Sequence, residues 1–285
     1  MKSVVKVSPD PPRVLNYGYK TRPVQLIHDK IPKSLIQFLV DNAKKEIQKK
    51  RYGFRDDPYA NVPQENLTMI RKSRDNIKRL RLDNDNIWTR EHNRPSVQAP
   101  RSLMSVYYLI CFLLDNIYKE NPIDRFWFLE TVARMPYFSY VATLHMYETL
   151  GFWEIDGELK QIHLEEEINE GMHLRVMESL GGDTLWWNRF LARHGAMAYY
   201  VVLLFLYLFN PRLAYLSSEL LEMHAVDTYT EFYESNEAIL KNMPLTPAAY
   251  QYAPEADSMY DVFVDIAEDE GYHAETMRTI RQYRS

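Results

Sequence analysis

Two short segments carry the residue types best able to bind a metal and support redox chemistry. The motif Glu-x-x-His occurs at 170–173 and again at 270–273, with the carboxylate and the imidazole three residues apart. On an α-helix this spacing brings both side chains to one face. Two such helices, with one glutamate from each of two further helices, supply the ligands of di-iron carboxylate bundles. Glu130 and Glu222 are the further candidates, each within an apolar segment that we expect to be helical.

The motif alone is weak, because a chain with eight histidines contains roughly 0.6 copies by chance. Ordinary polar positions on solvated helix faces would also explain it. The context of the two other glutamates favours a site. Glu130 follows Phe-Trp-Phe-Leu, and Glu222 lies in an apolar stretch with no Lys or Arg one turn away. A buried carboxylate is costly unless it is paired or bound to a metal, so these glutamates predict a shared metal pair.

The composition limits the class of protein. With 285 residues the chain can bury a sizeable core, and we expect one domain with an extension. The formal net charge of -5 argues against nucleic acid as a partner. The single cysteine, Cys111, lies in an apolar segment and is expected to be a small core residue. The first 30 residues show neither an apolar signal core nor the acid-poor composition of a transit peptide.

We predict an all-α protein in two parts. Residues 1–100 form an N-terminal arm that is partly irregular because of its prolines, with short helices at 33–50 and 65–82. Residues 101–285 form a helical bundle, because no segment shows the period-two alternation of a strand. The predicted helices of the bundle cover about 102–119, 124–149, 158–180, 183–209, 211–242 and 257–283.

Two of these predicted helices, 102–119 and 183–209, are apolar over more than one face. A helix of a four-helix bundle needs only one inward apolar stripe. The surplus apolar surface could cover other helices, form a dimer interface or enter one leaflet of a membrane. The longest apolar run, 195–209, is short for a helix that crosses a membrane. We therefore expect two additional membrane-facing helices and a homodimer.

Several segments resemble the alternative oxidase superfamily, and more closely its plastid terminal oxidase branch. The resemblance covers roughly residues 101–280, with the ligand motifs in the same order, and no motif of the arm takes part. The matching segments are Leu-Glu-Thr-Val-Ala at 129–133, Leu-His-Met-Tyr-Glu-Thr at 144–149, Asn-Glu-Gly-Met-His-Leu at 169–174, Phe-Leu-Ala-Arg-His at 190–194, Asn-Met-Pro at 242–244, Tyr-Asp-Val-Phe-Val at 260–264 and Asp-Glu-Gly-Tyr-His at 269–273.

The resemblance implies a ferritin-like di-iron four-helix bundle that acts as a non-haem quinol oxidase on one membrane leaflet. Such an enzyme passes four electrons from two quinols to oxygen and forms water without pumping protons. The implied quinol is plastoquinol or ubiquinol, with plastoquinol expected first, and the expected membrane is a thylakoid or a bacterial inner membrane. The implied cofactor is two iron ions, and the implied ligands are Glu130, Glu170, His173, Glu222, Glu270 and His273.

The resemblance also implies residues that handle the quinol and its electrons. Tyr229 matches a tyrosine beside the metal pair, and it lies seven residues after Glu222 on the same helix face. It could give up an electron and a proton, or simply pack with its hydroxyl bonded. His224 stands where mitochondrial members carry a carboxylate, which favours the plastid-like branch. The implied pocket for the quinol head consists of Arg125, Leu129, Leu221, Ala225 and Thr228.

The chemistry of the residues is compatible with this function. Four glutamates would offset the 4+ charge of a diferrous pair and leave a neutral site that tolerates burial. Asn169 and Asp269, each next to a ligand, are candidates to orient an imidazole or a carboxylate. Two alternatives remain. A soluble di-iron oxygenase or a ferritin-like iron oxidant would share the ligands without a membrane face, and a purely structural bundle would carry the motifs by accident.

Overall fold

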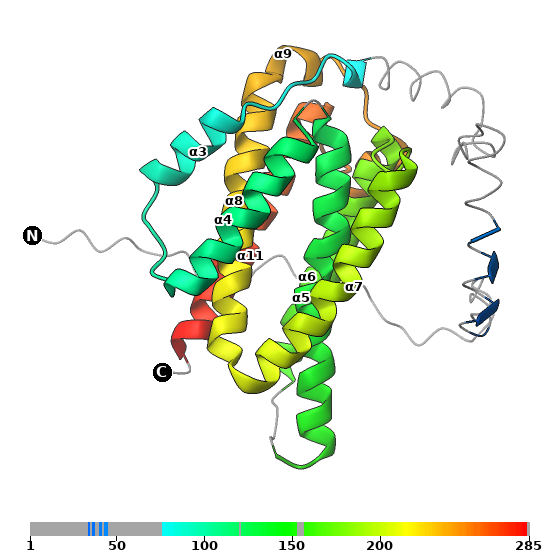
Figure 1. The fold of residues 1–285 in the computed structure, drawn as a ribbon. Coiled ribbons are helices and arrows are strands. Elements are labelled where there is room, and N and C mark those ends of the chain that lie inside the picture. The colour runs from blue at the N-terminus through cyan, green and yellow to red at the C-terminus, as the bar shows by residue number, and fades with distance from the viewer. Residues whose placement is uncertain are drawn as a thin grey trace, which may run out of the picture. The chain divides into compact units, whose positions relative to one another are not determined.

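The computed structural model describes residues 34, 36–37, 40–41, 43–44, 76–119, 121–152 and 157–283. Contacts divide the chain into two units, Met1–Tyr52 and Gly53–Ser285. In the first unit the described positions after residue 34 are helical, as predicted for 33–50. In the second unit every regular element described is an α-helix (Figure 1).

Four helices form the bundle that carries the candidate site. They are α5 (Pro122–Thr149), α6 (Glu158–Leu180), α8 (Pro211–Ser235) and α11 (Met259–Tyr283). α5 packs along α6, and α8 packs along α11 (Figure 1). Each helix contributes to the main hydrophobic core, for example through Phe126, Val176, Phe232 and Phe263. The prediction of an all-α four-helix bundle is therefore confirmed.

Local sequence determines where these helices begin. α5 and α8 both start at an Asn-Pro pair, and proline suits the first helical turn because its missing N–H would have no helical partner there. The side chain of Asn210 also accepts a hydrogen bond from the backbone N–H of Leu213 at 3.1 Å. Asp261 caps the start of α11 by accepting from the backbone N–H of Ser258 at 2.9 Å.

A pair of glycines ends α6 and allows the chain to turn into α7 (Trp186–Phe209), which packs against α5. Gly181 has a φ of 96°, a left-handed conformation that favours glycine. At Gly182 a Cβ atom would lie 2.5 Å from the Cβ of Trp127 and 2.7 Å from the carbonyl oxygen of Ile123. Only glycine therefore lets this turn approach α5 so closely.

The helix predicted to run to residue 242 ends instead at Ser235. The side chain of Asn236 bonds the backbone of Arg81 in both directions, accepting at 2.9 Å and donating at 2.7 Å. This long-range pairing competes with continuation of the helix, and the short α9 (Glu237–Leu240) follows. The segment between the helices predicted at 211–242 and 257–283 also contains a short helix, α10 (Pro247–Tyr252), which packs against α6.

The predicted arm contributes one helix that the sequence analysis did not identify. α3 (Asn84–Asn93) is capped by Asp83, whose side chain accepts from the backbone N–H of Asp85 at 2.9 Å, and the helix packs against α8. Most of the helix predicted at 65–82 lies outside the described residues. The contact division falls between Tyr52 and Gly53, so the segment 76–100 belongs to the same unit as the bundle.

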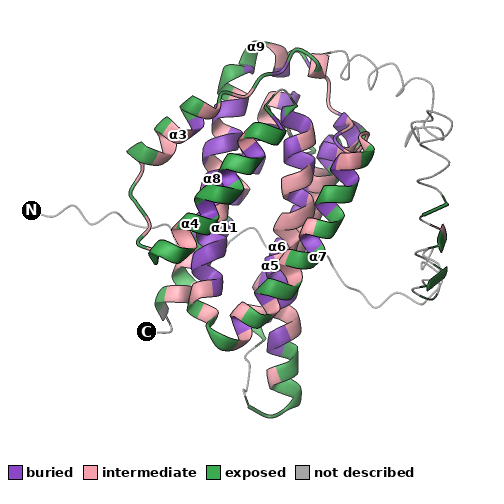
Figure 2. Cartoon of the chain, in the orientation of Figure 1, coloured by how far each residue is buried: buried purple, intermediate pink, exposed green. Residues whose placement is uncertain are grey.

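Two helices outside the bundle expose much of their apolar surface, as the green parts of α4 (Arg101–Ile117) and α7 show in Figure 2. On α4 the side chains of Leu109 and Phe112 are 57% and 62% exposed, and on α7 those of Val202 and Phe205 are 57% and 59% exposed. In the described part of the chain, α7 is the one helix long and apolar enough to cross a membrane.

Candidate metal centre

Six side chains from the four bundle helices converge in the interior. Each belongs to a residue that is at most 5% exposed. α5 and α8 contribute one glutamate each, and α6 and α11 contribute one Glu-x-x-His motif each. The structure therefore brings together all six residues that the sequence analysis selected: Glu130, Glu170, His173, Glu222, Glu270 and His273.

These side chains form two overlapping groups, each able to hold a metal ion. One group adds Glu130 and His173 to Glu170 and Glu270, and the other adds Glu222 and His273 to the same two glutamates. Within each group the ligand atoms all lie within 4.8 Å of one another.

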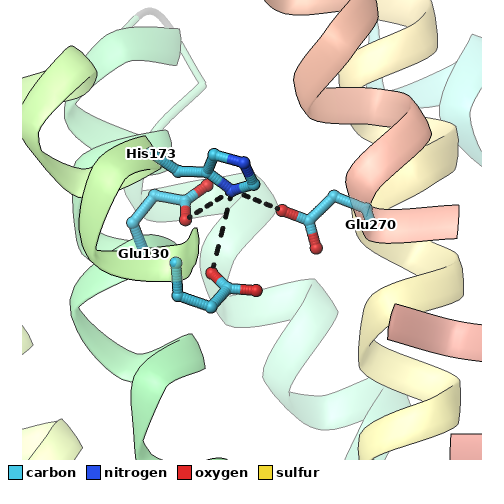
Figure 3. A group of neighbouring side chains, drawn as sticks. Glu130, His173 and Glu270 are labelled. Carbon is cyan, nitrogen blue, oxygen red and sulfur yellow. Dashed lines mark ion pairs between the residues drawn. The ribbon is translucent and has the colours of Figure 1, made fainter. Parts of the chain in front are cut away.

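In the first group, Nδ1 of His173 lies 3.3 Å from an oxygen of Glu270 and 3.7 Å from an oxygen of Glu130 (Figure 3). In the second group, Nδ1 of His273 lies 2.8 Å from an oxygen of Glu170. The two shared glutamates thus lie between two potential ion positions.

Several atoms at this centre have no hydrogen-bond partner among the described residues. They include one oxygen of Glu130, both oxygens of Glu170, and Nδ1 of both His173 and His273. Buried polar atoms nearly always have a partner, and leaving one without a partner is costly. Metal ions would satisfy all of these atoms together, because each is a lone-pair donor facing the same small volume.

The electrostatics of the centre also favour a cation. Burial raises the pKa of Glu170 well above its ordinary value, and the nearby Glu130 and Glu222 raise it further. Burial raises the pKa of Glu270 likewise, with Glu170 as the next contribution. Four carboxylates cannot all ionise here without compensating positive charge. Carboxylates with imidazoles suit first-row transition metals, so the residues fit a metal pair.

Asp269 holds one of the two imidazoles. Its Oδ2 lies 3.1 Å from Nε2 of His173 and accepts hydrogen bonds from Asn169 at 2.8 Å and from the Tyr252 hydroxyl at 2.6 Å. Burial opposes ionisation of Asp269, but these bonds outweigh it and lower its pKa to about 2. The ionised carboxylate keeps the proton of His173 on Nε2, so the lone pair of Nδ1 faces the centre.

Two buried tyrosines contact the glutamates that come singly from α5 and α8. The hydroxyl of Tyr229 on α8 donates to Oε1 of Glu130 on α5. The hydroxyl of Tyr137 on α5 donates to Oε1 of Glu222 on α8 at 2.7 Å. Tyr229 also stacks on Phe126, with ring centroids 4.2 Å apart.

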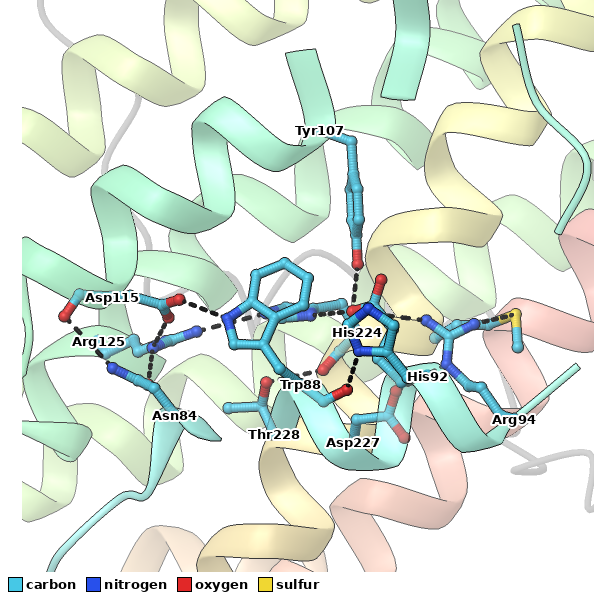
Figure 4. A network of polar contacts seen from close by, with 12 residues as sticks. Asn84, Trp88, His92, Arg94, Tyr107, Asp115, Arg125, His224, Asp227 and Thr228 are labelled. Carbon is cyan, nitrogen blue, oxygen red and sulfur yellow. Dashed lines mark hydrogen bonds and ion pairs between the residues drawn. The ribbon is translucent and has the colours of Figure 1, made fainter. Parts of the chain in front are cut away.

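Arg125, predicted for the quinol pocket, is fully buried in a polar network between α3, α4, α5 and α8 (Figure 4). Its guanidinium donates to Asp115 at 2.8 Å and to Asn84 at 3.0 Å, and it lies 3.4 Å from Nε2 of His224. Its Nε has no hydrogen-bond partner among the described residues. A buried donor without a partner is rare, so this N–H calls for an explanation such as a bound ligand.

The other residues predicted for the quinol pocket lie on two helices. Leu129 is on α5 with Arg125, and Leu221, Ala225 and Thr228 are on α8. The Thr228 hydroxyl donates to the backbone carbonyl of His224 at 2.7 Å, which leaves its methyl group to pack. Leu221 packs in a small cluster with residues of α4, and Ala225 borders the main core. Leu129 is half-buried on α5, one turn after Arg125.

α3 also contributes to this network, which no motif in the sequence indicates. Glu91 lies 3.0 Å from Nδ1 of His224 and accepts from the Tyr107 hydroxyl at 2.7 Å. Arg94 donates to Asp227 at 2.7 Å. Glu91 and His224 are 133 positions apart in the chain, as are Arg94 and Asp227, so no local spacing indicates these two pairs.

Comparison with known proteins gives one family. The family described as alternative oxidase matches residues 73–282. The chain is 42% identical over 187 residues to ubiquinol oxidase 4, chloroplastic/chromoplastic, from Arabidopsis thaliana, covering 58% of this chain and 53% of the relative.

Mitochondrial relatives are more distant. Ubiquinol oxidase 2, mitochondrial, from Nicotiana tabacum is 32% identical over 190 residues, covering 64% of this chain and 62% of the relative. Ubiquinol oxidase 2, mitochondrial, from Glycine max is 28% identical over 186 residues, covering 64% of this chain and 55% of the relative. In each case the match covers between half and two thirds of the relative.

Proposed function

We propose that this chain, which belongs to the alternative oxidase family, oxidises a quinol and reduces oxygen to water at a pair of iron ions. The observation that carries the proposal is the pair of overlapping buried ligand groups that share Glu170 and Glu270. Plastoquinol is the proposed quinol, because the plastid-type relative is more similar in sequence than the mitochondrial ones. A soluble oxygenase or a ferritin-like iron oxidant is not favoured, since the matched relatives are named ubiquinol oxidases.

The six buried residues would hold the iron pair. Glu130 and His173 would belong to one ion, Glu222 and His273 to the other, and the two shared glutamates to both. The charge of four ionised carboxylates balances that of two ferrous ions. With the ions bound, the carboxylates can therefore be ionised although they are buried. When bound, the irons would cycle between the ferrous and ferric states and so carry electrons from quinol to oxygen.

The surrounding residues orient the ligands. Asp269 fixes the tautomer of His173, and the tyrosine hydroxyls on Glu130 and Glu222 hold one oxygen of each carboxylate. With one oxygen held by a phenol, the other remains directed at the centre. Such supporting bonds commonly matter for metal affinity nearly as much as the ligands themselves.

Tyr229 is the proposed electron donor within the site. Four electrons are needed per oxygen molecule, and two ferrous ions supply two when both become ferric. The phenol of Tyr229 is buried, and its hydroxyl bonds directly to Glu130, so an electron and a proton can leave it together.

The proposed pocket for the quinol head lies beside Arg125. This side chain is buried, it is held in place by Asp115 and Asn84, and its Nε has no partner among the described residues, which a quinol oxygen would supply. Leu129, Leu221, Ala225 and Thr228 would form the apolar walls against which a quinol ring packs. His224 stands between the guanidinium and Glu91, with Nε2 facing Arg125 and Nδ1 facing Glu91, and so helps to hold the arginine in place.

The proposed membrane contact is monotopic. The exposed apolar surfaces of α4 and α7 would enter one leaflet of a thylakoid or bacterial inner membrane, where a quinol also resides. We also propose a homodimer, in which part of the exposed apolar surface of α4 and α7 would form the interface. The unit 101–285 would then hold the whole catalytic bundle, with residues of the arm closing one side of it.

Oxygen uptake by membranes that contain the protein tests the proposal. With added plastoquinol and with cyanide present to silence haem oxidases, we expect uptake that depends on the protein and on quinol. Metal analysis of the purified protein should give two irons per chain. A protein that carries no iron, or that consumes oxygen equally without quinol, would contradict the proposed function.

A further inference from the structure

A second group of buried aromatic side chains lies between the bundle and α7. Tyr215 on α8 and His163 on α6 form its centre, with Nε2 of the imidazole 3.0 Å from the phenol oxygen. On the other side of the ring, Nδ1 of His163 lies 3.1 Å from Oε2 of Glu166. The phenol, the imidazole and the carboxylate thus form one hydrogen-bonded series. None of the functions proposed above uses this series.

This hydrogen-bonded series is connected to the metal centre by contacts between aromatic rings. Tyr137 donates to Glu222, and its ring centroid lies 6.2 Å from that of His163. The rings of His163 and Tyr215 are stacked, with centroids 5.7 Å apart. Tyr207 on α7 continues the series, since its hydroxyl lies 2.7 Å from that of Tyr215. A continuous chain of aromatic rings therefore runs from a proposed ligand to the helix with the exposed apolar face.

The burial of these groups limits what they can do. Tyr137, His163, Tyr207 and Tyr215 are each at most 1% exposed. A buried phenol needs a hydrogen-bond partner in any case, and a serine or a backbone carbonyl would suffice. Here the partner is an imidazole, which is a base, and a carboxylate stands behind it. This arrangement allows the proton of a phenol to move to nitrogen when the phenol loses an electron.

Resting on the proposed function, we propose that Tyr215 is a second redox-active tyrosine, which supplies one electron to the metal centre when quinol is scarce. In this step the O–H bond of Tyr215 breaks and an N–H bond forms at Nε2 of His163. The electron passes along Tyr137 to the metal centre, where it would replace one of the electrons that quinol otherwise supplies for the reduction of oxygen. Tyr207 donates its hydroxyl hydrogen bond to the phenoxyl oxygen. One electron from quinol, with the proton returned from His163, restores the phenol.

Electron paramagnetic resonance on a single turnover tests this role. Iron-loaded protein with ring-deuterated tyrosine is reduced, mixed with oxygen in the absence of quinol, and frozen at successive times. The mixture is held at about pH 9, above the pKa of about 8 to which burial raises Glu166, so that the carboxylate is ionised. The starting variant is Tyr229→Phe, which removes the other candidate radical.

The proposal expects a tyrosyl signal in Tyr229→Phe that is lost when Tyr215→Phe is added. Adding Tyr207→Phe should shift the signal, because the phenoxyl oxygen loses its hydrogen-bond donor. The matched control is Tyr118→Phe, since Tyr118 is also buried and donates to Asn188 at 2.6 Å but lies outside the ring chain. That change should leave the signal intact.

The absence of a tyrosyl signal in Tyr229→Phe, or its persistence after Tyr215→Phe, would overturn the proposal. Should Tyr215→Phe fail to retain two irons, His163→Gln decides, because it keeps the phenol and removes the base, and the signal should again be lost. Quinol-dependent oxygen uptake by the wild-type protein is measured alongside. Normal uptake with a signal independent of Tyr215 contradicts this inference alone, whereas absent uptake contradicts the proposed function.

Discussion

The hydroxyl of Tyr137 donates to Glu222 at 2.7 Å, and this pair is repeated in the opposite direction by Tyr229 and Glu130. In each helix the tyrosine follows the glutamate by seven residues, and it reaches the glutamate of the other helix. α5 and α8 therefore make equivalent contributions to the centre. The equivalence ends at the next neighbours, because Tyr229 stacks on Phe126 whereas Tyr137 contacts the imidazoles of His163 and His273.

The first prediction concerns Tyr229. The change Tyr229→Phe removes only the hydroxyl, so packing against Phe126 should be kept and iron should stay bound. If the phenol supplies an electron, most of the oxygen uptake should be lost at unchanged iron content. Tyr118→Phe serves as the control for loss of a buried hydroxyl. Near-normal uptake in correctly loaded Tyr229→Phe would assign this tyrosine to packing.

The second prediction concerns the ligands themselves. Glu222→Ala and His273→Ala each remove a donor that belongs to only one of the two groups, so iron content should fall and oxygen uptake should be abolished. Circular dichroism should show that most helicity is retained. Glu219→Gln is the matched control on α8, because Glu219 is equally buried but pairs with Arg278 and Arg281. Full activity in either ligand variant would remove that residue from the site.

The third prediction concerns Asp269, which touches His173 rather than the centre. Asp269→Asn keeps the size of the side chain but removes the charge that fixes the imidazole tautomer. We expect a loss of metal affinity of roughly 10–100-fold, the usual effect of losing a group that orients a metal ligand. Competition with a chelator measures this affinity. Equal affinity in the variant and the wild type would show that Asp269 has only a structural role.

The ligands could be predicted from the sequence because the spacing of helical residues determines their direction. Glu-x-x-His must present both side chains on one face, and an isolated glutamate in an apolar helix must find a partner. Tyr137 could have been found by the same rule, since it follows Glu130 at the spacing that led to Tyr229.

The network around Arg125 could not be predicted, because its contacts are not local. Glu91 reaches His224 from α3, and Asn236 ends α8 by bonding Arg81. Arg81 and Glu91 lie in a largely polar segment whose residues have no periodicity that would indicate such pairings. Only the packing of α3 on α8 makes them partners. The arm is therefore predicted only as a partly irregular segment, although its end at 76–100 supplies side chains to the candidate pocket.

The fourth prediction concerns pH and follows from Glu166. Burial raises the pKa of this carboxyl from 4.5 to about 8, so between these values the folded metal-free protein keeps a proton that the unfolded chain loses. The associated stability is complete below pH 4.5 and is lost as the pH rises toward 8. Glu170 and Glu270, whose pKa values are also raised by burial, act in the same direction.

Urea unfolding of chelated protein at several pH values measures this effect. The free energy of unfolding should fall with rising pH, and Glu166→Gln should flatten the slope by up to about 1.4 kcal/mol per pH unit within that window. Iron should reverse the trend, because metal displaces the protons of its carboxylates and binds more tightly as the pH rises. A slope that Glu166→Gln leaves unchanged would contradict the buried, protonated state of this carboxyl.

The last prediction concerns the membrane. Leu109 on α4 and Val202 on α7 are each 57% exposed, so an aspartate at either position remains in water when the protein is free and should fold. In a leaflet the same carboxylate would be expensive, because an ionised group loses its hydration there. We expect Leu109→Asp and Val202→Asp to reduce the fraction that floats with liposomes, while iron content is kept.

Gln161→Asp is the control, because it adds the same charge at an exposed position on α6, away from the apolar faces of α4 and α7. It should leave flotation unchanged, because α6 is not proposed to enter the leaflet and an added charge there does not oppose insertion of α4 and α7. Flotation reduced equally by all three variants would indicate repulsion from anionic lipid instead of lost insertion, and a repeat with neutral liposomes separates the two. Wild-type protein that stays soluble without detergent and ignores liposomes would remove the physical basis for a lipid-dissolved substrate.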